Sequence, residues 1–243
     1  MKSFSIRLLS AVALAIVLIT TAQAGVIRDD KSESDFEFLF APYLWGVSLD
    51  GDSNGAELDA SFSDILSALN VALSLHTELH HGKWFAVVDP TYLSLEMDVP
   101  TPGPAEPEAD VDIWLVEVWG GYKLFENWSI YGGVRYQDQD IEFTGLPTPA
   151  PITGFDDSWT DFFAGVRFNY DLNDKWFVAG RGDIGVGDSD SSYNLSIFFN
   201  RKIGKTMALN LGYRWFENDY DNAPTYTWDV RQTGPVVGYT WAF

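Results

Sequence analysis

The residues of this chain that are best suited to chemistry are its three histidines, His76, His80 and His81. They lie in a stretch with the alternating pattern of a β-strand, in which residues four apart are separated by roughly 13 Å. In that geometry His80 and His81 point to opposite faces of the strand. One metal ion cannot collect the three imidazoles, so the sequence predicts no zinc or iron site.

Hydrolysis would need a nucleophile beside one of these imidazoles. In a serine-dependent barrel hydrolase, the hydroxyl must lie within hydrogen-bond reach of a histidine. No serine in the sequence around His76 is clearly placed to contact its ring. A serine on a neighbouring strand remains an alternative. We therefore expect no catalytic residue and keep a lipid- or peptide-hydrolysing enzyme as an alternative.

A glycine-rich motif and several acidic clusters offer two other kinds of site. Residues 180–185 read G-R-G-D-I-G, but dinucleotide binding requires such a motif between a strand and a helix. Here the motif lies inside a predicted strand, so we expect no cofactor. Acidic clusters in the long loops suit calcium or magnesium, but none has EF-hand spacing, and they predict only loose binding of divalent cations. These clusters are Asp50/Asp52, Glu106/Glu108/Asp110, Asp156/Asp157, Asp188/Asp190 and Asp219/Asp221.

The first 24 residues have the features of a secretory signal peptide. Lys2 and Arg7 precede an apolar run over residues 8–20. Ala-Gln-Ala at 22–24 is a cleavage site of small residues. We expect residues 1–24 to be removed, residues 25–35 to form a periplasmic tail, and residues 36–243 to fold as one domain. Cleavage would remove two basic residues and no acidic residue, which changes the net charge from −20 to −22.

Composition narrows the class of protein. A chain this acidic is a poor partner for nucleic acid, so we expect none to bind. Aromatic residues make up 16% of the chain, with 10 tryptophans, yet no apolar run after the leader is long enough for a membrane helix. The remaining classes are a soluble all-β protein and a membrane barrel.

Segments of β type follow one another through the rest of the chain, joined by connections that alternate in length. Short turns such as 81–83 and 125–127 alternate with long acidic loops such as 50–70 and 100–110. This asymmetry is typical of outer-membrane barrels. The sequence therefore predicts an all-β fold, a closed antiparallel up-and-down transmembrane β-barrel of about ten strands, with eight strands as the nearest alternative. The strand cores are expected at 36–49, 72–81, 84–97, 111–124, 128–143, 159–170, 176–187, 192–202, 206–218 and 226–243.

The alternation of side chains assigns most strand charges to the interior. A charge in the lipid layer costs a few kcal/mol near the midplane, whereas in a narrow lumen each charge can find an opposite partner. A repeat such as Gly-Val-Arg-Tyr at 133–136 puts the glycine and the arginine on the same inner face. We expect a lumen charge network that fills most of a barrel of this width. Its members are Glu78, Asp89, Glu117, Arg135, Asp161, Arg167, Arg181, Asp183 and Arg214.

One segment of the first long loop breaks the β pattern. Its apolar positions have helical spacing: Phe62, Ile65, Leu66 and Leu69. Ser61 or Ser63 could cap the start of a helix there. We expect a short helix over residues 61–70 on the extracellular side, packed against the barrel rim, with a lid folded over or into the mouth as the alternative.

Aromatic residues mark one end of the predicted barrel. Three short turns are each followed at once by a tryptophan, at Trp84, Trp128 and Trp176, and Trp241 lies near the end of the last strand. We expect these four side chains to form an aromatic girdle at the periplasmic membrane interface. In the last strand, period-two spacing puts one set of bulky residues on a common face: Val237, Tyr239, Trp241 and Phe243.

These closing residues resemble the last strand of bacterial outer-membrane barrels, whose C-terminal Phe with alternating aromatic residues is the recognition signal for insertion. Residues 36–243 as a whole resemble the OmpA-like and porin-like class of small barrels, in particular a widespread and poorly characterised family. The resemblance is carried by Ala-Pro-Tyr-Leu-Trp-Gly at 41–46, the segment 61–70 with the following strand and Gly-Lys-Trp at 82–84, Leu-Gly-Tyr-Arg at 211–214, and Gly-Pro at 234–235 leading to Phe243. It implies the outer membrane of a Gram-negative bacterium, contact with lipid and lipopolysaccharide, and the barrel-assembly machinery as a partner during insertion.

These patterns indicate the cellular location of the protein more directly than its function. We expect a non-enzymatic integral barrel that is either structural or a narrow, low-conductance channel. Beside the barrel hydrolase, the alternative is a surface receptor or adhesin that acts through the acidic loops with proline clusters at 100–104 and 147–151.

Overall fold

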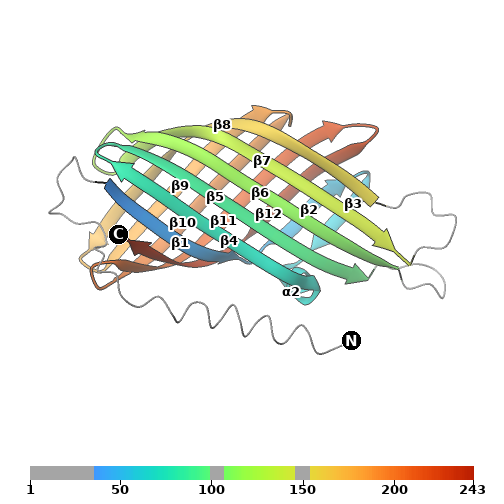
Figure 1. The fold of residues 1–243 in the computed structure, drawn as a ribbon, viewed down its shortest axis with the longest axis horizontal. Helices are drawn as coiled ribbons and strands as arrows, with labels where there is room; N and C mark the ends of the chain where they lie inside the picture. The colour runs from blue at the N-terminus through green and yellow to red at the C-terminus, as the bar shows by residue number, and fades with distance from the viewer. Residues whose placement is uncertain (1–35, 99–106, 146–153) are drawn as a thin grey trace.

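The computed structural model describes residues 36–98, 107–145 and 154–243, which form a closed antiparallel β-barrel (Figure 1). The predicted leader and tail and both proline clusters lie outside the described residues. The strands are β1 (Phe36–Trp45), β2 (Ser48–Ser53), β3 (Ala56–Ala60), β4 (Leu69–His81), β5 (Trp84–Asp98), β6 (Glu108–Lys123), β7 (Trp128–Thr144), β8 (Gly154–Asn173), β9 (Trp176–Gly187), β10 (Ser191–Ile203), β11 (Met207–Asn222) and β12 (Tyr226–Ala242).

The barrel wall has ten strand positions, because β1 and β2 are two parts of one wall strand. β1 pairs with β4 on one side and with β12 on the other, which closes the sheet. β2 continues along β12 in the register of β1, and β3 folds back on β2 as a hairpin. The prediction of a closed barrel of about ten strands is confirmed.

The break between β1 and β2 lies opposite a proline. Pro235 of β12 has no N–H to donate to the ladder, and the facing residue on the other strand is Gly46. The carbonyl of Pro235 still accepts a hydrogen bond of 2.8 Å from the N–H of Gly46. Because Pro235 can accept a hydrogen bond here but cannot donate one, the ladder is interrupted between Trp45, where β1 ends, and Ser48, where β2 begins.

The outer face of the barrel carries a band of exposed apolar and aromatic side chains. At one margin Trp84 packs against Tyr122, and at the other margin Tyr92 packs against Trp114. On β5 this band extends from Trp84 to Tyr92, roughly the nine residues that a tilted strand needs to cross a bilayer. Between the margins Val118 and similar residues face outward and are about half exposed.

Glycines on the inner face allow the backbone and Cβ atoms of the next strand to approach closely. A Cβ atom on Gly133 would lie 2.4 Å from the Cβ of Trp119, and one on Gly165 would lie 2.7 Å from the Cβ of Asp183. Gly133 and Gly165 belong to the repeat in which a glycine precedes an inward arginine by two residues. The repeat therefore reflects a packing requirement of the lumen.

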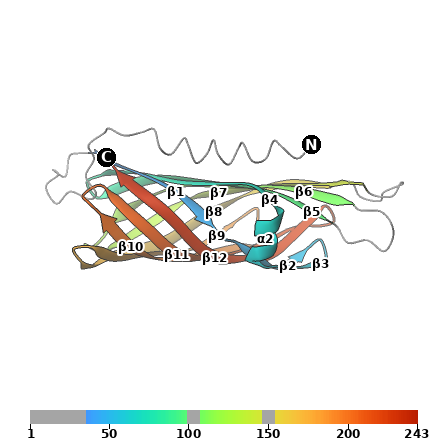
Figure 2. The same cartoon turned by 90° about the horizontal axis from the view of Figure 1, so that it is seen from below.

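The helix predicted in the first long loop is confirmed as α2 (Phe62–Ala68). Ser61 caps it through a capping box with Asp64, and the Ser61 hydroxyl and N–H both donate to the Asp64 carboxylate and lower the pKa of that group. Ile65 is buried. α2 crosses the barrel wall beyond the end of β1, so it forms part of the rim (Figure 2). No helix among the described residues is long and apolar enough to cross a membrane.

Replacement of Gly133 by alanine should destabilise the barrel by about 1–3 kcal/mol, because the added methyl group overpacks the space beside Trp119. Gly182 is the matched control: it faces outward, and a Cβ there would have no neighbour closer than 3.7 Å. Gly182→Ala should change stability by less than about 0.5 kcal/mol. Urea unfolding of the folded barrel in lipid vesicles measures both variants, and equal stabilities would contradict this account of the repeat.

Candidate functional site

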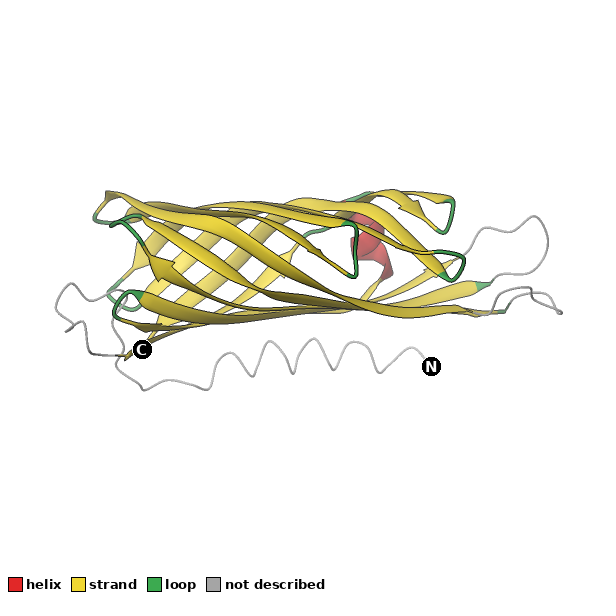
Figure 3. Ribbon diagram, turned by 90° about the horizontal axis from the view of Figure 1, so that it is seen from above, coloured by secondary structure: helices red, strands yellow, loops and turns green. Residues whose placement is uncertain are grey.

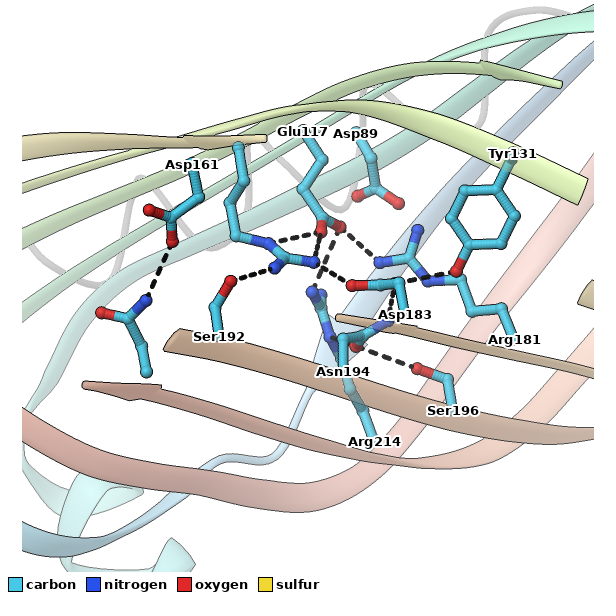
Figure 4. A network of polar contacts seen from close by, with 12 residues as sticks. Asp89, Glu117, Tyr131, Asp161, Arg181, Asp183, Ser192, Asn194, Ser196 and Arg214 are labelled. Carbon is cyan, nitrogen blue, oxygen red and sulfur yellow. Dashed lines mark hydrogen bonds and ion pairs between the residues drawn. The ribbon is translucent and has the colours of Figure 1, made fainter. Parts of the chain in front are cut away.

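The centre of the lumen is organised around the carboxylate of Glu117 on β6. Its Oε1 accepts hydrogen bonds from Nε and Nη2 of Arg135 at 2.8 and 2.6 Å. Its Oε2 accepts from Arg181 at 2.5 Å and from Arg214 at 3.2 Å. Figure 4 shows three arginines from β7, β9 and β11 converging on this one group. Glu117 has an exposed fraction of 0%.

Arg135 extends the network toward the opposite wall. Its Nη2 also donates to Asp183 at 2.7 Å and its Nη1 donates to Ser192 at 3.0 Å. The guanidinium lies between the rings of Phe163 and Phe216, at 4.6 and 4.8 Å from their centroids. Such cation–π contacts suit a desolvated arginine. Arg135 is as fully buried as Glu117.

Neutral polar side chains complete the central network. The hydroxyl of Tyr131 and the amide of Asn194 donate to Asp183 at 2.8 and 2.9 Å. The carbonyl oxygen of Asn194 in turn accepts a hydrogen bond of 3.0 Å from Nε of Arg214. Because the ionic groups also have neutral partners, the desolvation of the buried charges is offset by several hydrogen bonds.

A second polar cluster lies nearer the short turns and includes two of the histidines. Glu78 contacts Nη2 of Arg167 at 2.6 Å and Nε2 of His80 at 2.6 Å. Both ring nitrogens of His76 face carboxylates, with Nε2 3.3 Å from Glu78 and Nδ1 2.8 Å from Asp89. Asp89 also accepts a hydrogen bond of 2.7 Å from the hydroxyl of Tyr43.

The nine residues of the predicted lumen charge network all lie on the inner face, but they do not form one set of ion pairs. Arg135 neighbours Asp161 in the β7–β8 register yet forms ion pairs only with Glu117 and Asp183. Asp161 instead accepts hydrogen bonds from Ser189 and Asn218. Asp89 contacts a tyrosine and a histidine. The nine residues divide into three sets: the Glu117 group (Glu117, Arg135, Arg181, Asp183 and Arg214), the Glu78 group (Glu78 and Arg167, with Asp89 joined to them through His76), and Asp161.

Sequence reasoning did not identify several members of these clusters: Tyr43, His76, His80, Tyr131, Ser192 and Asn194. The parity that selects the charged residues also places these six on the inner face. A search of every inward position for polar atoms, with neutral residues included, would have found them.

Toward the long loops, the lumen is filled mainly by apolar and aromatic side chains, beside the buried amides of Gln137 and Gln139. We call this group the mouth core: Val47, Leu49, Ile65, Leu95, Ala109, Val111, Trp159, Tyr220, Tyr226, Trp228 and Val230. The ring of Trp159 stacks on that of Tyr220 with centroids 4.4 Å apart. The lumen therefore contains two polar clusters, and the mouth core lies between these clusters and the long loops.

The contacts of His76 and the arrangement of possible metal ligands bear on the chemistry of the described ranges. Both nitrogens of His76 are used by carboxylates, so neither is free to accept a proton from a serine hydroxyl. Within residues 36–98, 107–145 and 154–243, no group of three or more histidine or acidic side chains is arranged to hold a metal ion.

The predicted girdle and terminal residues lie at the end of the short turns (Figure 1). Trp84, Trp128 and Trp176 each pack on an aromatic ring of the next strand. Trp241 packs against Tyr239 and Phe40. The backbone N–H of Phe243 donates to the carbonyl of Phe38 at 2.8 Å, so the last residue is tied to the first strand. Val237 faces outward, as Phe243 does.

No protein-family model and no curated protein sequence matches the chain. Among solved structures it is similar to the translocator domain of the autotransporter NalP from Neisseria meningitidis, with a TM-score of 0.49 and 10% identity over 98% of this chain and 95% of that one. It is also similar to the attachment invasion locus protein Ail of Yersinia pestis, with a TM-score of 0.40 and 10% identity over 86% of this chain and 99% of Ail. A Pseudomonas aeruginosa FadL homologue has a TM-score of 0.37 and 8% identity over 86% of this chain and 90% of its own. These neighbours are bacterial outer-membrane β-barrels, and the likenesses assign no activity, ligand or partner to this chain.

Replacement of Glu117 by glutamine should destabilise the barrel by about 3–5 kcal/mol, because the change leaves three buried arginines without their shared counter-charge. The matched control is Glu217→Gln, which removes one partner of the half-exposed pair with Arg231, 3.1 Å apart. An exposed pair contributes at most about 1 kcal/mol. Urea unfolding in vesicles measures both, and a Glu117 variant as stable as the control would contradict the central role of this carboxylate.

Proposed function

We propose that this protein is an integral outer-membrane barrel whose lumen is closed by its own side chains, so that it serves as a structural barrel of the cell envelope and not as an open ion channel. The observation that carries the proposal is the complete burial of Glu117 and Arg135 at the middle of the lumen. Side chains that line a water-filled pore would be exposed to that water, as they are in wide porins.

A second barrier supports the same conclusion. An ion that passed the Glu117 group would next meet the mouth core, where Leu95, Trp159 and Val230 are almost completely buried. Transfer of an ion into such an apolar layer is strongly unfavourable without compensating partners. The two barriers in series favour the structural version of the expected function over the narrow channel.

The placement in the outer membrane rests on the outer surface. The apolar band between the aromatic margins matches the strand length that a bilayer requires. Beyond the band, outward carboxylates such as Asp112 and Asp140 surround the mouth. We propose that lipid and lipopolysaccharide surround the band, that divalent cations bind loosely at the acidic loops, and that the terminal aromatic residues are read by the barrel-assembly machinery during insertion.

The non-enzymatic assignment is part of this proposal. It is supported by the engagement of His76 with Asp89 and Glu78, which gives the imidazole a role in the lumen network. The receptor alternative depends on the proline clusters, which lie outside the described residues, so no structural observation favours it.

Purified barrel in a planar lipid bilayer should show no discrete conductance steps, because both lumen barriers are intact. The triple variant Arg181→Ala/Arg214→Ala/Trp159→Ala weakens both barriers, so it should admit water and small ions through the lumen and raise the leak current. Arg231→Ala, which removes an exposed arginine at the rim, is the control and should stay silent. Regular open-channel steps from the wild-type protein would contradict the closed lumen.

Replacement of Val118 by arginine should cost about 2–4 kcal/mol of membrane stability, because the charge would lie near the middle of the apolar band. Asp140→Arg places the same side chain beyond the band and should cost about 0–1 kcal/mol. The fraction of each variant that is recovered in the outer membrane in its folded, heat-modifiable form reports the difference. If the wild-type protein fractionates as a free periplasmic species without detergent, the membrane placement is wrong.

A further inference from the structure

The barrel wall is split on one side above the middle of the structure. Pairing between β1 and β4 ends where Tyr43 faces Ser74. Beyond that point β2 follows β12, whereas β4 follows β5, so the residues of β4 from Leu69 to Leu73 have no strand partner on the side of β1. In the part of the chain that the structure describes, β3 pairs with β2 alone. The sheet therefore has two free edges, one on β3 and one on β4.

Helix α2 fills the space between these two edges. Figure 2 shows it between the β2–β3 hairpin and the β4–β5 pair, and Figure 3 shows it at the same end of the barrel, behind the strands nearest the viewer. The helix contacts β2 and β3 on one side and β5 on the other. The ring of Phe62 covers Gly46, so closely that a Cβ atom on that glycine would lie 2.9 Å from the ring.

The gap lies at the outer margin of the apolar band. Leu73, on the free edge of β4, pairs with Tyr92, one of the aromatic residues that mark this margin. On α2 itself, Phe62 and Leu66 are 42% and 55% exposed. Their neighbours Ser63 and Ser67 are polar, so the outer surface of the helix is amphipathic and suits the boundary between acyl chains and headgroups.

The interior behind the helix is suited to uncharged, apolar molecules. Ile65 is the buried side chain of α2, and it packs into the mouth core. The side chains around it are aliphatic and aromatic, so a charged group would be desolvated there without a partner. Toward the other end, the buried Glu117 group closes the lumen. A molecule that reaches the mouth core can therefore exchange with the membrane or the exterior.

We propose that α2 is a gate in the side of the barrel, through which an uncharged, apolar molecule dissolved in the outer leaflet enters the mouth core. When the helix moves outward, Ile65 leaves the mouth core and the molecule takes its place among the aromatic rings. Ile65 is the fully buried side chain of α2, whereas Phe62, which packs over Gly46, and Leu66 keep about half of their surface exposed at the membrane boundary. The proposal rests on the placement in the outer membrane proposed above.

The test uses an uncharged alkane that carries a diazirine, dissolved in vesicles that contain the barrel. After irradiation, mass spectrometry identifies the labelled residues. Label is expected on Val118 and Val166, which face the lipid, and also on Leu95 and Trp228 in the mouth core. The chain has no cysteine, so Gly46→Cys/Phe62→Cys can be joined by a short bis-maleimide that fixes α2 to the wall. This link should lower mouth-core labelling at least fivefold and leave Val118 labelling unchanged.

Three controls make the result decisive. The same double variant treated with a monofunctional maleimide should keep its mouth-core label. Ile65→Ser should increase that label severalfold because it removes the inward anchor, whereas Leu66→Ser, on the exposed face of the helix, should not. Absence of mouth-core label in both the wild type and Ile65→Ser, or label that the link does not change, would overturn the gate. Absence of label on Val118 and Val166 would overturn the membrane placement and the gate with it.

Discussion

The structure depends on the neutralisation of one buried carboxylate. Glu117 is fully buried in the lumen, and a lone charge there would be strongly unfavourable. Arg135, Arg181 and Arg214 bring opposite charge to it from three other strands. Because those strands lie on different parts of the wall, the ion pairs tie the barrel across its interior as well as along its ladder. The network therefore closes the lumen and holds the wall together through the same contacts.

The division of the lumen into polar and apolar layers determines what the barrel can do. Glu117 and Arg135 are fully buried at the middle of the lumen, and the mouth core above them is made of aliphatic and aromatic side chains. Under the proposed function, an ion in this interior would lose its hydration without gaining a partner. The split in the wall beside α2 lies next to this apolar layer, and the proposed gate would connect the layer with the membrane there.

Much of the fold could be predicted because alternation and turn length are local properties. The period of two identifies Glu117 and Arg135 as inward, and helical spacing identifies the segment around Ile65. Contacts across the lumen are not local. Asp161 neighbours Arg135 in the register but bonds to Ser189 and Asn218, and the histidine–carboxylate contacts of His76 depend on how strands meet around the barrel. The wall split also depends on pairing partners, since Pro235 alone does not show which neighbouring strand will diverge.

The central claim is that the Glu117 group acts as one coupled unit, and a double-mutant cycle measures this coupling directly. Glu117→Gln, Arg135→Gln and the double variant would be compared by reversible urea unfolding in lipid vesicles. If the two side chains are partners in a buried network, the effects should be non-additive by about 0.5–3 kcal/mol, with the double variant less destabilised than the sum of the single variants. Additive effects within about 0.3–0.5 kcal/mol would contradict the account.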